Sequence, residues 1–194
     1  LFTLSSHSPY DFPGGRSIDW GGDEQDFLNS IHYADSCLGD FFEKARQQDW
    51  YSNTLFVVVA DHSHVTPKKW KVYSKEKSRV PMLLYGEVLK KEYRGQEVSK
   101  IGNHLDIPST LLYQLNIDAK KYKYSKNLLD TTSLGFASFT FHNGFGWVNP
   151  KSSFGYSFNY NKVFRTEDST VLQVQEKVEK EGKAFFQVSF DDFY

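Results

Sequence analysis

Thr54-Leu55-Phe56-Val57-Val58-Val59-Ala60-Asp61-His62 is the stretch that decides the fold class. Its first seven residues form an unbroken, mostly apolar run rich in β-branched side chains, which is typical of a strand buried on both faces in a parallel sheet. Asp61 and His62 therefore stand at the carboxyl end of that strand. In open α/β sheets ligands bind at this edge, and a carboxylate beside an imidazole can hold a divalent cation such as Zn²⁺ or Mn²⁺. The stretch predicts an α/β fold with metal-dependent chemistry.

A helix and another strand are predicted ahead of this stretch. Between residues 27 and 45 apolar side chains recur at steps of four and three, the period of an amphipathic helix. Residues 1–6 are predicted to form a strand, so that strand, helix and strand make a right-handed crossover between parallel strands. The stripe expected to be buried on the helix consists of Phe27, Ile31, Ala34, Leu38, Phe41 and Ala45.

The alternation of strand and helix continues to about residue 116. Residues 80–85 form a short apolar run that predicts a strand, with Pro81 at its start or on an edge. Asp106 is predicted to cap the next helix, which has Pro108 in its first turn. The apolar stripe expected to be buried on this helix consists of Leu111, Leu112 and Leu115.

Beyond about residue 120 the pattern changes to short alternating segments. Residues 136–148 and 154–164 alternate on either side of turn residues, which predicts a small antiparallel sheet packed on the α/β part. Residues 180–193 are predicted to form a closing helix. We therefore divide the chain into an α/β part, residues 1–120, and an extension, residues 121–194. The closing helix is expected to bury Phe185, Phe186 and Phe193.

Composition and charge exclude some classes of protein. The net charge of −1 over 194 residues gives no basic surface of the kind that nucleic acid requires, so no nucleic-acid partner is expected. No apolar run approaches the roughly 18 residues of a membrane span, and the single Cys37 excludes an internal disulfide. The chain begins at Leu1 without Met, so we expect it to be part of a longer protein.

One basic region stands out between residues 68 and 100. It holds ten Lys or Arg against four Glu. Such a run forms either an ordinary solvated face or a positive rim that draws an anionic substrate towards Asp61 and His62. The basic residues are Lys68, Lys69, Lys71, Lys75, Lys77, Arg79, Lys90, Lys91, Arg94 and Lys100.

The order and spacing of several short motifs resemble a known family. The motifs are Ser6-His7-Ser8-Pro9-Tyr10, Asp35 with Leu38-Gly39, Asn53-Thr54, Ala60-Asp61-His62, Val80-Pro81 and Asp106-Ile107-Pro108-Ser109-Thr110-Leu111-Leu112. Together they resemble the sulfatase branch of the alkaline phosphatase superfamily. More closely, the chain is similar to the carboxyl-terminal part of the extracellular catalytic domain of lipoteichoic acid synthase-like proteins. Its aromatic tail, with Asn143-Gly144-Phe145-Gly146 and Gly182-Lys183-Ala184, is similar to the version found in Bacteroidetes.

The resemblance implies a metal site for which this chain supplies only some of the residues. Family members bind one divalent metal, and the ion implied here is Mn²⁺, Mg²⁺, Ca²⁺ or Zn²⁺. Asp61 and His62 match the metal-binding pair, and His7 matches a histidine that contacts the phosphate-bearing headgroup of the substrate. The nucleophile has no counterpart here and is expected upstream, so no catalytic nucleophile is assigned to this chain. Cys37 cannot be a formylglycine precursor, because it precedes Leu38-Gly39-Asp40 on a predicted helix.

Two further histidines are candidate substrate contacts. His64 lies two residues beyond His62 and could point into the same cleft, or could be an ordinary loop residue. His104 lies just before a predicted helix amino terminus, which is a favourable place to meet an anion, although most such termini bind nothing.

The function implied by the resemblance is that of a metal-dependent phosphoryl-group transferase or hydrolase. Its substrate would be an anionic phosphate- or sulfate-bearing lipid or glycan, and its partner would be the missing amino-terminal half of the same domain. The implied location is extracytoplasmic, with the parent anchored by upstream transmembrane helices. The alternatives are a sulfate ester hydrolase acting on glycans and a non-catalytic module that binds anionic envelope glycans or lipids. This chain alone is expected to be inactive, because it lacks the nucleophile.

Overall fold

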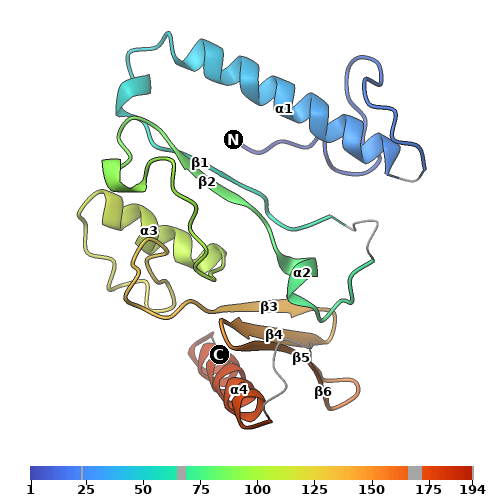
Figure 1. Ribbon diagram of the computed structural model, residues 1–194, viewed down its shortest axis with the longest axis vertical. Helices are drawn as coiled ribbons and strands as arrows, with labels where there is room; N and C mark the ends of the chain where they lie inside the picture. The colour runs from blue at the N-terminus through green and yellow to red at the C-terminus, as the bar shows by residue number, and fades with distance from the viewer. Residues whose placement is uncertain (23, 65–68, 166–171, 194) are drawn as a thin grey trace. The chain divides into compact units, whose positions relative to one another are not determined.

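The computed structural model describes residues 1–22, 24–64, 69–165 and 172–193. The chain alternates helices and strands up to α3 and then forms four consecutive strands and a long helix (Figure 1). This order confirms the α/β class and the change of pattern near residue 120. The elements are α1 (Gln25–Ala45), η1 (Tyr51–Asn53), β1 (Phe56–Val59), α2 (Lys75–Ser78), β2 (Met82–Tyr85), η2 (Lys91–Tyr93), η3 (His104–Asp106), α3 (Ile107–Gln114), β3 (Ala137–Phe141), β4 (Gly144–Asn149), β5 (Ser152–Ser157), β6 (Lys162–Arg165) and α4 (Leu172–Phe193).

The chain folds as two compact units. Among the described residues, the first unit holds 1–22, 24–56 and 84–88, and the second holds 57–64, 69–83, 89–165 and 172–193. The boundary between the units runs through β1 and β2. The sequence-based division at residue 120 separates the chain differently, and it stays a prediction.

Helix α1 lies in the first unit, where the period of the apolar residues predicted a helix. Its carboxyl end packs Phe42 against Phe56, with ring centroids 5.0 Å apart, and against Tyr85, at 5.2 Å. The hydroxyl groups of Tyr51 and Tyr85 lie 3.1 Å apart. This hydrogen bond, assisted by Arg46, lowers the pKa of Tyr85.

The buried face of α1 differs from the predicted apolar stripe. Its most buried side chains besides Ala45 are Asn29 and Ser30, whereas Ile31 and Phe41 are about two-fifths exposed. Asn29 accepts hydrogen bonds from the backbone amides of Ser17 and Ile18 and therefore holds the preceding loop against the helix. The prediction for Ile31 and Phe41 was wrong because the polar residue Asn29, which binds the preceding loop, lies on the buried side of the helix. A pattern of apolar residues cannot predict such a contact.

The predicted strand at residues 1–6 is not formed. Residues 1–4 have no regular structure, and Leu1, Phe2 and Leu4 are largely exposed. A strand needs a neighbour for its backbone groups, and β1 pairs with β2 instead. The end of β2 lies beside the start of β1, because Gly86, just after β2, approaches the backbone of Thr54 and Leu55, just before β1. These two strands therefore run in opposite directions.

The predicted strand at residues 54–60 is confirmed as β1, but its burial is not. All four of its residues are half-buried, so the expectation of a strand buried on both faces was wrong for the described chain. Parallel neighbours of β1 stay a prediction for the rest of the domain. The strand predicted after Pro81 is confirmed as β2.

Helix α3 is confirmed, again with a different buried face. Ser109 and Thr110 are its buried residues, while Leu115 is 64% exposed. Both polar side chains are hydrogen-bonded: the hydroxyl of Ser109 donates to the carbonyl of Ser125, and that of Thr110 to the carbonyl of Asp106. The hydroxyl of Thr110 also accepts from the backbone amide of Leu128, so polar contacts with the loop after α3 hold this helix in place of a leucine stripe.

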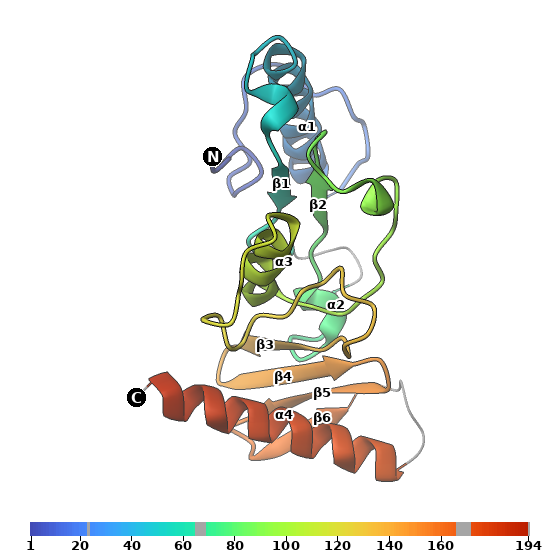
Figure 2. The ribbon, with the colours of Figure 1, turned by 90° about the vertical axis from the view of Figure 1, so that its left-hand side faces the viewer.

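The second unit contains the predicted antiparallel sheet and closing helix. Strands β3 to β6 form a meander in that order, and α4 lies along one face of it (Figure 2). Phe145, Trp147 and Phe154 point into the core with Val178 of α4. Phe145 stacks on Phe186, with centroids 4.3 Å apart. Phe185 and Phe186 pack on this core as predicted, whereas Phe193, at the end of α4, is 81% exposed and that prediction was wrong.

Gly182 lets α4 approach the sheet closely. A Cβ atom at this position would lie 2.6 Å from the Cβ of Trp147 and 2.7 Å from ring carbons of Phe154. Both neighbours are almost fully buried, so neither has space to move away. A glycine at this point is required by packing and not by backbone conformation.

We expect Gly182→Ala to lower the free energy of unfolding by about 1–3 kcal/mol, the usual cost of overpacking a core. Gly39→Ala is the matched control, because Gly39 is also inside a helix but its Cβ would meet nothing within 4 Å. That control should stabilise by roughly 0.5–1 kcal/mol through helix propensity. Urea unfolding followed by circular dichroism measures both, and equal stabilisation by the two changes would contradict the packing argument.

Candidate metal centre

Asp61 and His62 follow β1 after one intervening residue, Ala60, and their side chains are exposed to solvent. Their side chains are 60% and 74% exposed, and 3.7 Å separates Oδ2 of Asp61 from Nε2 of His62. The sequence-based placement of this pair at the carboxyl end of the strand is therefore confirmed by the bounds of β1. Neither side chain is buried in the packed interior.

Local hydrogen bonds orient both side chains. Oδ1 of Asp61 accepts from the backbone amide of His62, at 2.9 Å. Nδ1 of His62 lies 2.9 Å from the carbonyl oxygen of Ser63. A carbonyl can only accept, so the proton of this contact sits on Nδ1, and Nε2 keeps a lone pair that can bind a metal.

The donor set fits part of a divalent metal site. Imidazole nitrogen and carboxylate oxygen bind Zn²⁺ at about 2.0–2.2 Å, so two atoms 3.7 Å apart can both reach one ion. A complete site needs further ligands. Within the part of the chain that the structure describes, no group of three or more His, Cys, Asp or Glu is arranged to hold a metal.

His7 lies in a tight loop of the first unit. Its Nδ1 is 2.7 Å from the carbonyl oxygen of Ser8, and its side chain is exposed. The loop is attached to α1 by an edge-to-face contact between the rings of Tyr10 and Phe27, with centroids 5.6 Å apart. His7 and the Asp61–His62 pair belong to different units, so the predicted shared cleft stays a prediction.

His64 and His104 are both in the unit that carries Asp61 and His62. His64 is half-buried, and its substrate-binding role stays a prediction. Nε2 of His104 lies 2.8 Å from the carbonyl oxygen of Ala60, the residue immediately before Asp61. Sequence reasoning missed this contact because 44 residues separate the two partners.

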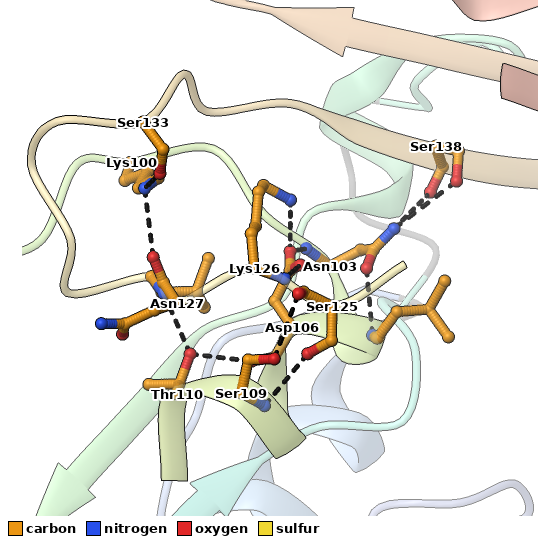
Figure 3. A network of polar contacts seen from close by, with 12 residues as sticks. Lys100, Asn103, Asp106, Ser109, Thr110, Ser125, Lys126, Asn127, Ser133 and Ser138 are labelled. Atoms are coloured by element: carbon orange, nitrogen blue, oxygen red, sulfur yellow. Dashed lines mark hydrogen bonds and ion pairs between the residues drawn. The ribbon is translucent and has the colours of Figure 1, made fainter. Parts of the chain in front are cut away.

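A buried ion pair supports the turn that carries His104 (Figure 3). Asp106 is completely buried, and its Oδ2 lies 2.6 Å from Nζ of Lys126. The carboxylate also accepts from the backbone amides of Lys126, at 2.9 Å, and Asn103, at 2.8 Å. Burial lowers the pKa of Lys126, although the contact with Asp106 opposes this effect.

The predicted helix cap at Asp106 needs correction. Its side chain does not cap α3. It instead closes a capping box with Asn103, whose side chain accepts from the backbone amide of Leu105. The three-residue spacing of Asn103 and Asp106 is the sequence signal for such a box, and it places the start of the helical segment at η3.

The basic region is partly used for internal contacts. Nζ of Lys100 donates to the carbonyl oxygens of Asn127 and Asp130, at 3.1 and 2.5 Å. Lys90 and Arg94 donate to other backbone carbonyls of the same unit. These three cations have structural partners, while Lys68 lies outside the described residues.

Cys37 lies exposed on α1, which confirms its predicted place on a helix. No helix among the described segments combines the length and the hydropathy that a membrane crossing requires.

Comparison with solved structures identifies the fold. A protein of the alkaline phosphatase superfamily from Vibrio parahaemolyticus matches with a TM-score of 0.72 and 22% identity, over 100% of this chain and 49% of that one. The chain thus shares its fold with about half of that protein.

Comparison of sequences identifies the family. The Sulfatase family model matches residues 1–117, and the chain belongs to the sulfatase family. It is 26% identical to lipoteichoic acid synthase 2 of Bacillus subtilis over 93% of this chain and 31% of that protein. It is 23% identical to lipoteichoic acid synthase 1 of the same organism over 91% of this chain and 29% of that protein. The chain thus spans less than a third of these relatives, and the resemblance found in its motifs is confirmed.

Proposed function

We propose that this chain is the carboxyl-terminal part of a metal-dependent phosphoryl-group transferase or hydrolase, of the phosphoglycerol transferase type. The observation that carries the proposal is the exposed Asp61–His62 pair at the end of β1, with donor atoms 3.7 Å apart. Membership of the sulfatase family and similarity to proteins named lipoteichoic acid synthase support it.

Asp61 and His62 would supply two of the metal ligands. When bound, a divalent ion activates a hydroxyl nucleophile and neutralises charge on the oxygens of the transferred group. Asp61 contributes a negative charge to the site. His62 contributes a neutral nitrogen ligand, and the Ser63 carbonyl oxygen holds its ring in the orientation that leaves Nε2 outward.

The remaining parts of the site come from elsewhere in the proposed enzyme. The nucleophile and the other metal ligands lie in the amino-terminal half of the same catalytic domain. The domain acts outside the cytoplasm, is anchored by preceding transmembrane helices, and takes an anionic phosphate-bearing lipid as substrate. His7 contacts the phosphate-bearing headgroup of this substrate. Nδ1 of His7 donates to Ser8, so its Nε2 donates to an anion only when the ring carries both protons.

Hydrolysis of sulfate esters on glycans is the second candidate, because the matching family model is described as Sulfatase. The identity of the nucleophile separates the two reactions: Thr favours phosphoryl transfer, whereas Cys or Ser converted to formylglycine favours sulfate hydrolysis. A protein without any of the three at this position is instead a module that binds anionic glycans or lipids.

Turnover of three substrates by the full-length protein tests the proposal. We expect a phosphoglycerol lipid to be turned over at least tenfold faster than p-nitrophenyl sulfate, with p-nitrophenyl phosphate as a simple phosphate probe. Chelation should abolish turnover, and one of Mn²⁺, Mg²⁺, Ca²⁺ or Zn²⁺ should restore it. Preference for the sulfate ester supports the second candidate. Turnover that survives chelation contradicts metal dependence.

A further inference from the structure

We propose that His104 is a positioning residue that holds the backbone of the candidate metal ligands Asp61 and His62. This inference rests on the proposed function, since it concerns the same metal site. The contact behind it is the 2.8 Å distance between Nε2 of His104 and the carbonyl oxygen of Ala60. Because a carbonyl only accepts, Nε2 of His104 carries the proton and donates it.

The position of Ala60 gives this hydrogen bond its effect. Strand β1 ends at Val59, so Ala60 is the first residue beyond the regular strand. Its carbonyl belongs to the peptide plane that leads into Asp61. A plane held at its oxygen has little freedom to rotate, and the direction of the Asp61 side chain depends on that rotation.

The segment is also held on its other side. The hydroxyl of Ser63 donates to the carbonyl oxygen of Lys77. Between these two attachments lie only Asp61 and His62, whose own contacts are with the neighbouring backbone. The two attachments therefore fix a short segment whose exposed side chains carry the metal donors.

His104 itself stands on a rigid support. It is the first residue of η3, whose capping box is made by Asn103 and Asp106. Asp106 is completely buried and paired with Lys126 (Figure 3). A continuous set of contacts thus connects the buried ion pair to the peptide that precedes Asp61.

This role differs from the substrate contact predicted for His104 from the sequence. At the start of this helical segment the side chain of Asn103 already accepts from the backbone amide of Leu105, so this amide is not available to an anion. The proton on Nε2 is already donated to Ala60. The contact with Ala60 can instead orient the metal ligands that follow it, in the way that outer hydrogen bonds orient metal-binding side chains.

The test compares His104→Leu with His104→Gln in the full-length protein. Leucine removes the donor, whereas the side-chain amide of glutamine can place an N–H near the position of Nε2. Isothermal titration with Mn²⁺ should show affinity about tenfold weaker in His104→Leu, at the lower end of the range for outer-sphere partners, and within roughly threefold of wild type in His104→Gln. His142→Leu, in an exposed turn of the same unit, is the control and should bind Mn²⁺ as wild type does.

Hydrogen exchange of the metal-free protein gives a second readout that needs no bound ion. Amides of residues 61–63 should exchange faster in His104→Leu than in wild type or His104→Gln. The positioning role is overturned if His104→Leu changes neither hydrogen exchange nor Mn²⁺ affinity. It is also overturned if His104→Leu and His104→Gln lose Mn²⁺ affinity equally. Neither result contradicts the proposed metal site. A wild-type protein that binds no divalent ion overturns the proposed function and this inference together.

Discussion

Replacing Asp106 by asparagine is expected to lower the free energy of unfolding of the second unit by about 3–5 kcal/mol, the range for breaking one side of a buried ion pair. The carboxylate is completely buried and accepts from three donors, the amide of Asn103 and the amide and ammonium groups of Lys126. Asparagine offers one accepting oxygen and turns its amide hydrogens towards the remaining donors. The ammonium of Lys126, only 14% exposed, then lacks its counter-charge.

Urea unfolding followed by tryptophan fluorescence, to which Trp147, buried in the same unit, contributes, measures the loss. Asp118→Asn is the matched control, because its carboxylate is 65% exposed and its contact with Lys120 is a surface ion pair at 3.5 Å. Such pairs contribute about 0–1 kcal/mol. Removing both buried charges in Asp106→Asn/Lys126→Met should cost less than Asp106→Asn alone, since no unpaired charge remains. Equal effects of Asp106→Asn and Asp118→Asn would show that the pair is not structural.

Local patterns predicted most elements of this fold. The apolar period around α1, the alternating segments of β3 to β6 and the proline after which β2 begins are all properties of short windows. The predictions of burial failed where they depended on tertiary contacts. Leu1–Leu4 had no strand beside it in the described chain, and Leu115 had no surface to cover it, so neither apolar segment is buried as predicted.

The candidate site was predictable only in part. Asp61 and His62 adjoin a recognisable strand, so their place at its end follows from the sequence. The contact of His104 with Ala60 and the pairing of Asp106 with Lys126 depend on how distant segments pack. The polar residues Asn29, Ser109 and Thr110 are buried because each meets particular loop atoms. The spacing of apolar residues along the sequence cannot predict such polar contacts.

Replacing either Asp61 or His62 by alanine is expected to reduce metal-dependent turnover of the full-length protein by about 10³-fold or more. A bound metal contributes several kcal/mol of charge stabilisation in the transition state, and each 1.36 kcal/mol corresponds to about a tenfold change in rate. The fold should tolerate both changes. The two side chains are mostly exposed, and surface substitutions usually alter stability by less than about 0.5 kcal/mol.

Rates at saturating metal and thermal unfolding curves of the same samples separate loss of chemistry from loss of structure. Asp118→Ala and His142→Ala remove an exposed acid and an exposed imidazole elsewhere in the same unit, and they should retain wild-type rates. Asp61→Asn keeps the shape of the side chain but removes its charge, so its rate should fall nearly as far as that of Asp61→Ala if the carboxylate binds the ion. If both alanine variants retain activity, the assignment of Asp61 and His62 as metal ligands is wrong. An enzyme that depends on one metal ion loses rate when it loses a ligand of that ion.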